Sequence, residues 1–146
     1  MKTKDNCILI TGGGSGIGRE LARRFHDLGN QVIVAGRTAE TLAETIDGRA
    51  AMHALTFDVS DAASIESFAA KALERFPAIN VLFNNAGIMQ REDLTTRGDA
   101  TVAEQTFITN MLGPIRLTNA LIDHLRAQDD AAIINTTSGL AFVPLI

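Results

Sequence analysis

The chain has 146 residues, of which 46% are hydrophobic and 21% are charged, and its formal net charge at pH 7 is −4. This length suits one domain with a single core, so residues 1–146 are expected to form one domain. The acidic balance argues against a basic face, so neither nucleic acid nor a membrane is expected as a partner.

The first residues do not have the pattern of a targeting segment or a membrane span. A charged start is followed by the apolar run Cys7–Ile10, which is too short for either. Cys7 is the single cysteine, so no internal disulfide can form and a cytoplasmic location is expected. It has no obvious base near it in sequence and is interpreted as a small buried residue, not a nucleophile.

A predicted strand at 6–11 leads into a glycine-rich turn and then a helical pattern. This context places backbone N–H groups at the positive end of a helix and predicts a pyrophosphate-binding site there. The alternative interpretation is a glycine-rich turn that binds no ligand. Gly12 can adopt angles closed to other residues, Gly16 removes a side chain facing the phosphates, and Gly18 lets the helix pack closely. The residues expected to hold the cofactor here are Thr11, Gly12, Gly14, Ser15, Gly16, Ile17 and Gly18.

The helix after this turn is expected to end at Gly29-Asn30 and to bury a stripe formed by Ile17, Leu21, Phe25 and Leu28. A second strand at 31–35 is followed by Gly36-Arg37. A carboxylate there would bond the ribose hydroxyls of NAD, whereas the Arg37 guanidinium can bind a 2′-phosphate bidentately. The sequence therefore predicts NADP(H) in preference to NAD(H), the alternative being that Arg37 is a solvated charge.

The third predicted strand, at 51–57, is followed by Asp58 and Val59 at the carboxyl edge of the sheet. Asp58 is expected to reach the adenine or to cap the next helix, for which Ser60 is also available. That helix begins at Ser60-Asp61 and stops at Pro77, and its apolar stripe contains Ile65, Phe68, Ala69, Ala72, Leu73 and Phe76.

The fourth predicted strand, at 80–83, ends at the same edge. Asn85, Ala86 and Gly87 lie just beyond it, where small and amide residues let the backbone approach the cofactor ribose. Taken alone, these residues could form an ordinary turn. The polar loop 89–98 that follows is expected to be a mobile surface segment.

A long helix is expected from about Thr101 to Leu125, with an interruption at Gly113-Pro114 that frees backbone groups near Asn110. Its predicted face carries Ile115, Thr118, Ile122 and Leu125. A fifth strand at 131–136 completes a βα alternation. Together these patterns predict an α/β fold, a Rossmann-type doubly wound parallel sheet with helices on both faces.

Four ordered motifs resemble those of the short-chain dehydrogenase/reductase family: Thr11-Gly12-x-x-x-Gly16-Ile17-Gly18, Asn84-Asn85-Ala86-Gly87, Asn110 in its helix, and Ile134-Asn135-Thr136-Thr137-Ser138. Gly36-Arg37 is similar to the NADP-preferring branch, and the stretch from Ser138 to Pro144 is more weakly similar to a DltE-like bacterial group. The resemblance extends from about Asn6 to the end of the chain.

This resemblance implies hydride transfer between a nicotinamide and a small-molecule carbonyl or alcohol substrate. It implies that Ser138 hydrogen-bonds the reacting oxygen and that Asn110 holds a water in the proton relay. Without the resemblance, Ser138 would be an ordinary turn serine. A homo-oligomer is expected for the full-length protein, and no metal site is predicted.

The family's acid/base is a tyrosine in a Tyr-x-x-x-Lys motif beyond the position of Ser138, which is absent here. The chain has no tyrosine, and Lys2, Lys4 and Lys71 lie far from the site in sequence. We therefore expect a C-terminally truncated member, inactive alone, whose sheet is missing its last strands. The strand at 131–136 would then lie on an open edge, which favours aggregation or pairing with another chain.

Two other functions are consistent with parts of the pattern. The first is a complete, non-catalytic NADP(H)-binding module, against which the apolar end Val143–Ile146 argues. The second is a nucleotide-dependent methyltransferase, which would need an acid after the second strand, where Gly36-Arg37 stands.

Overall fold

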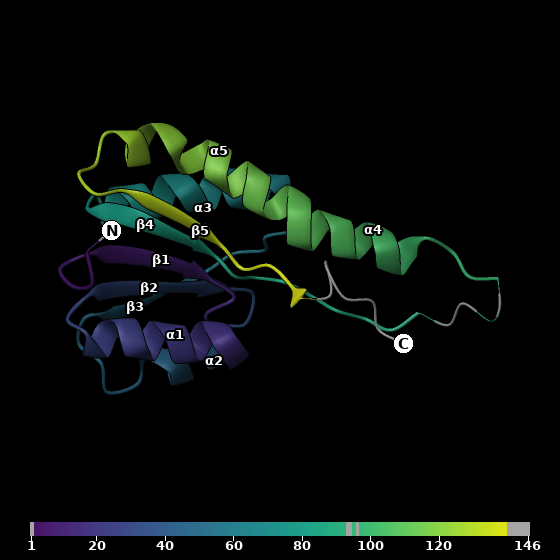
Figure 1. Ribbon diagram of the computed structural model, residues 1–146, viewed down its shortest axis with the longest axis horizontal. Helices are drawn as coiled ribbons and strands as arrows, with labels where there is room; N and C mark the ends of the chain where they lie inside the picture. The colour runs from purple at the N-terminus through teal and green to yellow at the C-terminus, as the bar shows by residue number, and fades with distance from the viewer. Residues whose placement is uncertain (1, 93–94, 96, 140–146) are drawn as a thin grey trace.

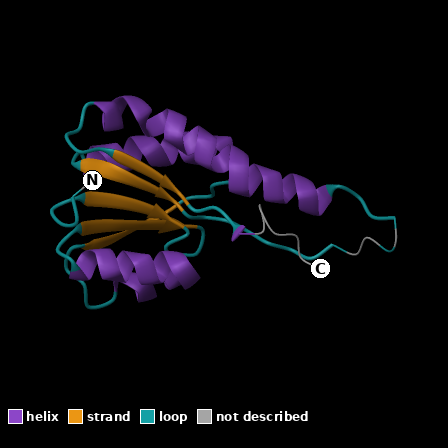
Figure 2. Cartoon of the chain, in the orientation of Figure 1, coloured by secondary structure: helices purple, strands orange, loops and turns teal. Residues whose placement is uncertain are grey.

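Five parallel strands form one sheet with helices on both faces (Figures 1 and 2). The computed structural model describes residues 2–92, 95 and 97–139. The strands are β1 (Cys7–Thr11), β2 (Gln31–Gly36), β3 (Met52–Thr56), β4 (Ile79–Asn84) and β5 (Ala132–Asn135). They lie in the order β3-β2-β1-β4-β5, and each neighbouring pair is parallel. The predicted α/β fold with a parallel sheet is confirmed.

The helices cover the sheet in two groups (Figure 1). α1 (Gly16–Asp27) and α2 (Ala39–Ile46) lie on one face, and α3 (Ala62–Arg75) and α5 (Gly113–Arg126) lie on the other. α4 (Thr101–Phe107) and a π-helical turn, η1 (Ile108–Leu112), lead directly into α5. Within the described residues, no helix combines the length and apolarity that crossing a membrane requires.

Alternate residues of the central strands fill two separate apolar layers. Ile8 and Ile10 belong to the layer that includes residues of α1 and α2, whereas Cys7 and Leu9 belong to the layer with α3 and α5. This alternation follows from the two-residue period of a strand, and it buries both faces of the sheet.

Cys7 is buried, as expected for a small core residue. It is 5% exposed, and its Sγ lies 3.2 Å from Oε1 of Gln31. Burial raises the pKa of the Cys7 thiol to about 11, so this group is not a thiolate at neutral pH.

α3 begins and packs as the sequence predicts. The Asp61 side chain accepts a hydrogen bond from the backbone N–H of Ala63 at 2.9 Å, and the helix ends at Arg75, just before Pro77. Asp61 is therefore the N-cap, in place of Asp58 or Ser60. The predicted stripe lies in the core: Ile65, Phe68, Ala69, Ala72 and Phe76 are buried and Leu73 is partly buried.

Replacing Asp61 with alanine is expected to lower the free energy of unfolding by about 1 kcal/mol, because one N–H of the first turn loses its partner. Glu66→Ala, on the exposed side of the same helix, is the control and should change it by less than about 0.5 kcal/mol. Urea unfolding of both variants measures the difference. Equal stabilities would show that the cap bond does not contribute.

The predicted stripe of α1 is wrong at both ends. Ile17 is 66% exposed and Leu28 is 56% exposed, while Gly18 and Ala22 are the buried residues of the helix. Ile17 lies in the first turn, beyond the apolar layer, and Leu28 lies after the last helical residue. Phe25, from the middle of the stripe, packs against the core as predicted.

The interruption near Pro114 takes the form of the π turn. The N–H of Gly113 donates to the carbonyl of Ile108, five residues back, and Pro114 falls in the first turn of α5, where a missing N–H costs little. Of the predicted face of α5, Leu125 is buried, Thr118 and Ile122 are half-buried, and Ile115 is 49% exposed. Both faces have apolar residues at helical spacing, and packing against α3 selects the row Gly113, Leu117, Leu121 and Leu125.

β5 lies at one edge of the sheet in the described part of the chain, as expected for the strand predicted at 131–136. Three of its residues are half-buried and Asn135 is exposed. The expected consequence, association through this edge, stays a prediction. The apolar residues Val143–Ile146 lie outside the described residues, and so does part of the loop 89–98.

Candidate cofactor site

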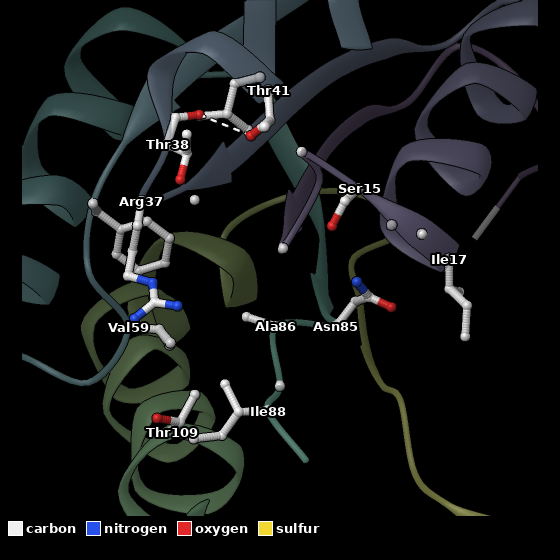
Figure 3. A pocket seen from close by; sticks show the side chains of 18 of the residues that line it. Ser15, Ile17, Arg37, Thr38, Thr41, Val59, Asn85, Ala86, Ile88 and Thr109 are labelled. Atoms are coloured by element: carbon white, nitrogen blue, oxygen red, sulfur yellow. Dashed lines mark hydrogen bonds between the residues drawn. The ribbon is translucent and has the colours of Figure 1, made fainter. Parts of the chain in front are cut away.

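A hollow of about 400 Å³ lies at the carboxyl edge of the sheet (Figure 3). β1 lies between β2 and β4 in the sheet, so the connections that follow β1 and β3 run in opposite directions along it. Open α/β sheets bind ligands at such a switch point. Every predicted cofactor residue except Thr11 lines this hollow: Gly12, Gly14, Ser15, Gly16, Ile17, Gly18, Arg37, Asp58, Val59, Asn85, Ala86 and Gly87.

Three glycines shape the loop between β1 and α1. Gly12 has a φ of +67°, and a Cβ there would lie 2.9 Å from Cα of Ala86. Gly16 has a φ of +51°, and a Cβ there would have no neighbour within 4 Å. A Cβ at Gly18 would collide with the carbonyl oxygen of Gly12 and lie 2.6 Å from Nδ2 of Asn85. The loop thus brings bare backbone to a helix N-terminus, an arrangement suited to an anion.

Thr11 is 1% exposed and is not among the residues that line the hollow. Its hydroxyl oxygen accepts hydrogen bonds from the N–H groups of Asn85 and Ala86, both at 3.0 Å. Its carbonyl accepts a third from Nδ2 of Asn85 at 3.1 Å. The polar atoms of Thr11 thus hold the end of β1 against the turn after β4, and its expected contact with the cofactor stays a prediction.

Arg37 stands on the wall opposite Ser15 and Ile17 in Figure 3, with Val59 beside it. It is exposed and follows directly after β2, where no carboxylate occurs. The adjoining wall is the start of α2, where the Thr41 hydroxyl donates to the carbonyl of Thr38 at 3.0 Å. A guanidinium at this place offers a planar pair of donors to an anionic group in the hollow.

Asp58 is the acidic side chain in the lining. Its Oδ1 accepts from the backbone N–H of Ser60 at 2.8 Å and from the Ser60 hydroxyl at 2.7 Å. Burial alone would raise the pKa of Asp58, but these two hydrogen bonds and the positive charge of Arg37 outweigh it and hold the pKa below its usual range. Asp58 therefore stays ionised at neutral pH, within reach of the Arg37 charge.

Asn110 joins the π turn to the segment after β4. Its Oδ1 accepts from the N–H of Ile88, and its Nδ2 donates to the carbonyl of the same residue, both at 2.8 Å. A Cβ at Gly87 would lie 3.4 Å from Oδ1 of Asn110, so the two segments are in close contact. The structure thus gives the Asn110 side chain a bridging role, and its contact with a relay water stays a prediction.

Replacing Asn110 with alanine should lower the free energy of unfolding by about 1 kcal/mol and speed hydrogen exchange at the Ile88 amide, because both bonds are lost. Asn119→Ala, an exposed asparagine of α5, carries the same gain in helix propensity and serves as the control. Exchange measured by NMR compares the two variants. Unchanged exchange at Ile88 in the Asn110 variant would contradict the bridging role.

Ser138 is exposed, lies three residues beyond β5, and is not among the residues that line the hollow. Its expected contact with a substrate oxygen stays a prediction. A second hollow, of about 460 Å³, lies between β5 and the helical segment η1–α5 and includes Asn110 and Thr137. Asn110 therefore lines this second space together with Thr137, the residue that precedes Ser138. The stretch Leu140–Pro144, which carries the weaker bacterial resemblance, lies outside the described residues.

Eight lining residues were not predicted from the sequence. They are Gly36, Thr38, Thr41, Leu42, Phe57, Ile88, Thr109 and Thr136. Most lie within two residues of a predicted one, so extending each motif past its strand end would have found them. Thr41 and Leu42 required the position of α2, which the local pattern did not supply.

Two curated relatives cover nearly all of this chain. A family model described as short chain dehydrogenase matches residues 6–146. The chain is 41% identical over 146 residues to the uncharacterized oxidoreductase DltE of Bacillus subtilis (strain 168), which spans 99% of this chain and 58% of that protein. It is 35% identical over 149 residues to dehydrogenase/reductase SDR family member 7B of Bos taurus, across 94% of this chain and 46% of that protein. The chain therefore spans about half the length of these relatives.

Solved structures show the same arrangement. Serine dehydrogenase from Escherichia coli aligns with a TM-score of 0.86 at 28% identity, covering 95% of this chain and 64% of that one. The closed form of serine dehydrogenase complexed with NADP+ also aligns with a TM-score of 0.86 at 28% identity, covering 95% of this chain and 56% of that one. One of these neighbours thus holds a dinucleotide.

Proposed function

Because this chain belongs to the short-chain dehydrogenase/reductase family of oxidoreductases, we propose that it binds NADP(H) in preference to NAD(H) in the hollow at the carboxyl edge of the sheet. Arg37 carries the proposal, since it places a guanidinium on the wall of the hollow directly after β2, where no carboxylate stands. The neighbour solved with NADP+ supports this choice.

The lining fits the parts of such a dinucleotide. The loop around Gly16 leaves open space where a Cβ would stand, as a pyrophosphate held by backbone N–H groups requires. Arg37 would bind the 2′-phosphate and the ionised Asp58 would accept from the adenine amine. Ala86 and Gly87 would leave room for the nicotinamide ribose.

When bound, the nicotinamide supplies or accepts a hydride. We propose that the full-length protein uses this chemistry on a carbonyl or alcohol of a small molecule, with Ser138 bonding the reacting oxygen and Asn110 ordering a water. The proton that accompanies the hydride needs a group of suitable pKa, and this chain has no tyrosine. We therefore propose that the chain alone binds the cofactor without turning over substrate, which is also what a non-catalytic NADP(H)-binding module would do.

Three further proposals concern the whole protein. The buried single cysteine and the acidic composition support a cytoplasmic location, with no role for nucleic acid or a membrane as partner. The exposed apolar residues Phe107, Met111 and Ile115 on the long helix support assembly into a homo-oligomer at full length.

Fluorescence titration tests the binding proposal. The chain has no tryptophan or tyrosine, so the nicotinamide emission of NADPH or NADH is free of protein emission. We expect NADPH to bind at least about tenfold more tightly than NADH, the equivalent of one charge-assisted interaction. Equal affinities would refute the preference, and no binding of either would refute the site.

Turnover of a carbonyl substrate by the isolated chain would refute the proposed lack of catalysis. Binding of S-adenosylmethionine in place of NADPH would support a methyltransferase instead.

A further inference from the structure

Two side chains outside the hollow hold the carbonyl groups of the glycine loop. Arg19, in α1, donates from Nε to the carbonyl of Gly14 at 3.0 Å and also from Nη2 to the same oxygen. Thr45, in α2, is fully buried, and its hydroxyl proton is shared between the carbonyl oxygen of Gly13, at 3.0 Å from Oγ1, and that of Thr41, at 2.9 Å. The two side chains are also joined, since Nε of Arg19 lies 3.2 Å from Oγ1 of Thr45. Neither residue is among those that line the hollow.

These contacts fix the direction of two backbone N–H groups. In a planar trans peptide the C=O of one residue points opposite to the N–H of the next. The N–H of Gly14 therefore points away from Thr45, and the N–H of Ser15 points away from Arg19. Gly14 and Ser15 both line the hollow, so the donors whose direction these two carbonyl contacts set belong to its lining.

We propose that Arg19 is a positioning residue for the cofactor pyrophosphate, acting from behind the glycine loop together with Thr45. The inference rests on the proposed NADP(H) site and adds to it a residue that never contacts the ligand. A loop that already has its donors aimed loses less conformational entropy on binding, so Arg19 should strengthen the binding of any ligand that carries the pyrophosphate.

The ion pair between Arg19 and Glu44 explains the placement of the Arg19 side chain less well than its bonds to the Gly14 carbonyl do. Nη2 of Arg19 lies 3.0 Å from Oε2 of Glu44, but the Glu44 side chain is 64% exposed, and such pairs contribute little. The Arg19 side chain is 28% exposed, and two of its nitrogens converge on one backbone oxygen. Arg24 provides the comparison, because its pair with Glu20 on the same helix is exposed at both ends, at 73% and 60%.

α2 keeps other attachments when Arg19 is removed. Arg23 donates from Nη2 to the carbonyl of Glu44 at 2.9 Å and from Nε to the carbonyl of Thr45 at 3.3 Å. Leu42 lies in the apolar layer with β2. The adenosine end of the site, at Arg37 and Asp58, should therefore keep its shape in an Arg19 variant, so the effect of Arg19 should be confined to the pyrophosphate.

The test compares Arg19→Met, Arg19→Lys and Thr45→Val with the control Arg24→Met. Each is titrated with NADPH, and with 2′-AMP, which carries the adenosine and its 2′-phosphate but no pyrophosphate. We expect Arg19→Met to weaken NADPH binding about tenfold and Arg19→Lys less, since an ammonium offers no fork of donors. Thr45→Val should weaken NADPH binding several-fold. 2′-AMP should bind all variants within about a factor of two, and Arg24→Met should match the unsubstituted chain.

NMR of the ligand-free chain gives a second readout that needs no cofactor. Arg19→Met should shift the amide signals of Gly14 and Ser15, and Arg24→Met should leave them in place. Circular dichroism confirms that each variant is folded. Equal weakening of NADPH and 2′-AMP would overturn the inference, as would an Arg19→Met chain with unchanged loop signals and NADPH affinity. A failure of the proposed function would look different from these outcomes, because the unsubstituted chain would then bind no NADPH. The inference about Arg19 would be refuted as well.

Discussion

Replacing Gly18 with alanine is expected to lower the free energy of unfolding by about 2 kcal/mol and to weaken NADPH binding. The new Cβ would collide with the backbone carbonyl of Gly12 and lie 2.6 Å from Nδ2 of Asn85, which donates to the Thr11 carbonyl. Overpacking of this kind costs about 1–3 kcal/mol. Alanine would normally stabilise a helical position by about 1 kcal/mol relative to glycine, so a net loss would demonstrate the clash.

Urea unfolding and NADPH titration measure the two effects of this substitution. Gly98→Ala is the control, because a Cβ there has no neighbour within 4 Å and its φ is not positive. It should change stability by less than about 0.5 kcal/mol and leave NADPH binding unchanged. A Gly18→Ala chain as stable as the control would show that α1 can move away from β1 at little cost. The close packing inferred for Gly18 would then be wrong.

The sheet and the glycine loop could be predicted because their signals are local. An apolar strand, a glycine-rich turn and a helical pattern follow one another within residues 6–28. The position of each glycine in this order indicates why a side chain is excluded there. The βα alternation then fixes the parallel sheet and gathers the strand ends at one edge. The strand ends therefore predict Gly12, Arg37 and Asn85 around a common space, and all three line the hollow.

The errors arose where two local patterns competed. α5 has apolar residues on two faces, and only packing against α3 selects Leu117, Leu121 and Leu125 over Ile115. Ile17 has the spacing of a core residue but stands past the edge of the sheet, where it lines the hollow instead. Periodicity reports the apolar faces of a helix and does not report where the neighbouring layer ends.

Polar contacts between residues far apart in the sequence could not be predicted. Thr11 and Asn85 are 74 residues apart, and Arg19 and Thr45 are 26 residues apart, yet each pair shapes one loop. A threonine or arginine in these places has several ordinary surface roles. The sequence could therefore indicate which residues surround the cofactor but not which residues hold them in position.

Replacing Arg37 with glutamate is expected to weaken NADPH binding about 100-fold while changing NADH binding by less than about threefold. The substitution removes a bidentate partner of the 2′-phosphate and puts a negative charge in its place. A carboxylate after β2 is also suited to the two ribose hydroxyls of NADH, which offsets other losses for that ligand. The preference between the two cofactors should therefore reverse.

Arg126→Glu separates this local effect from the change in net charge. Arg126 ends α5 at the opposite edge of the sheet, near His124, whose Nε2 lies 3.0 Å from the carbonyl oxygen of Ile79 at the start of β4. If the whole-protein charge governs phosphate binding, both variants should weaken NADPH to a similar degree. If Arg37 contacts the 2′-phosphate, only Arg37→Glu should weaken NADPH binding. Raising the salt concentration should then reduce the difference in affinity between NADPH and NADH in the unsubstituted chain. Equal losses of NADPH and NADH in Arg37→Glu would instead mean that Arg37 supports the wall of the hollow without reading the 2′-phosphate.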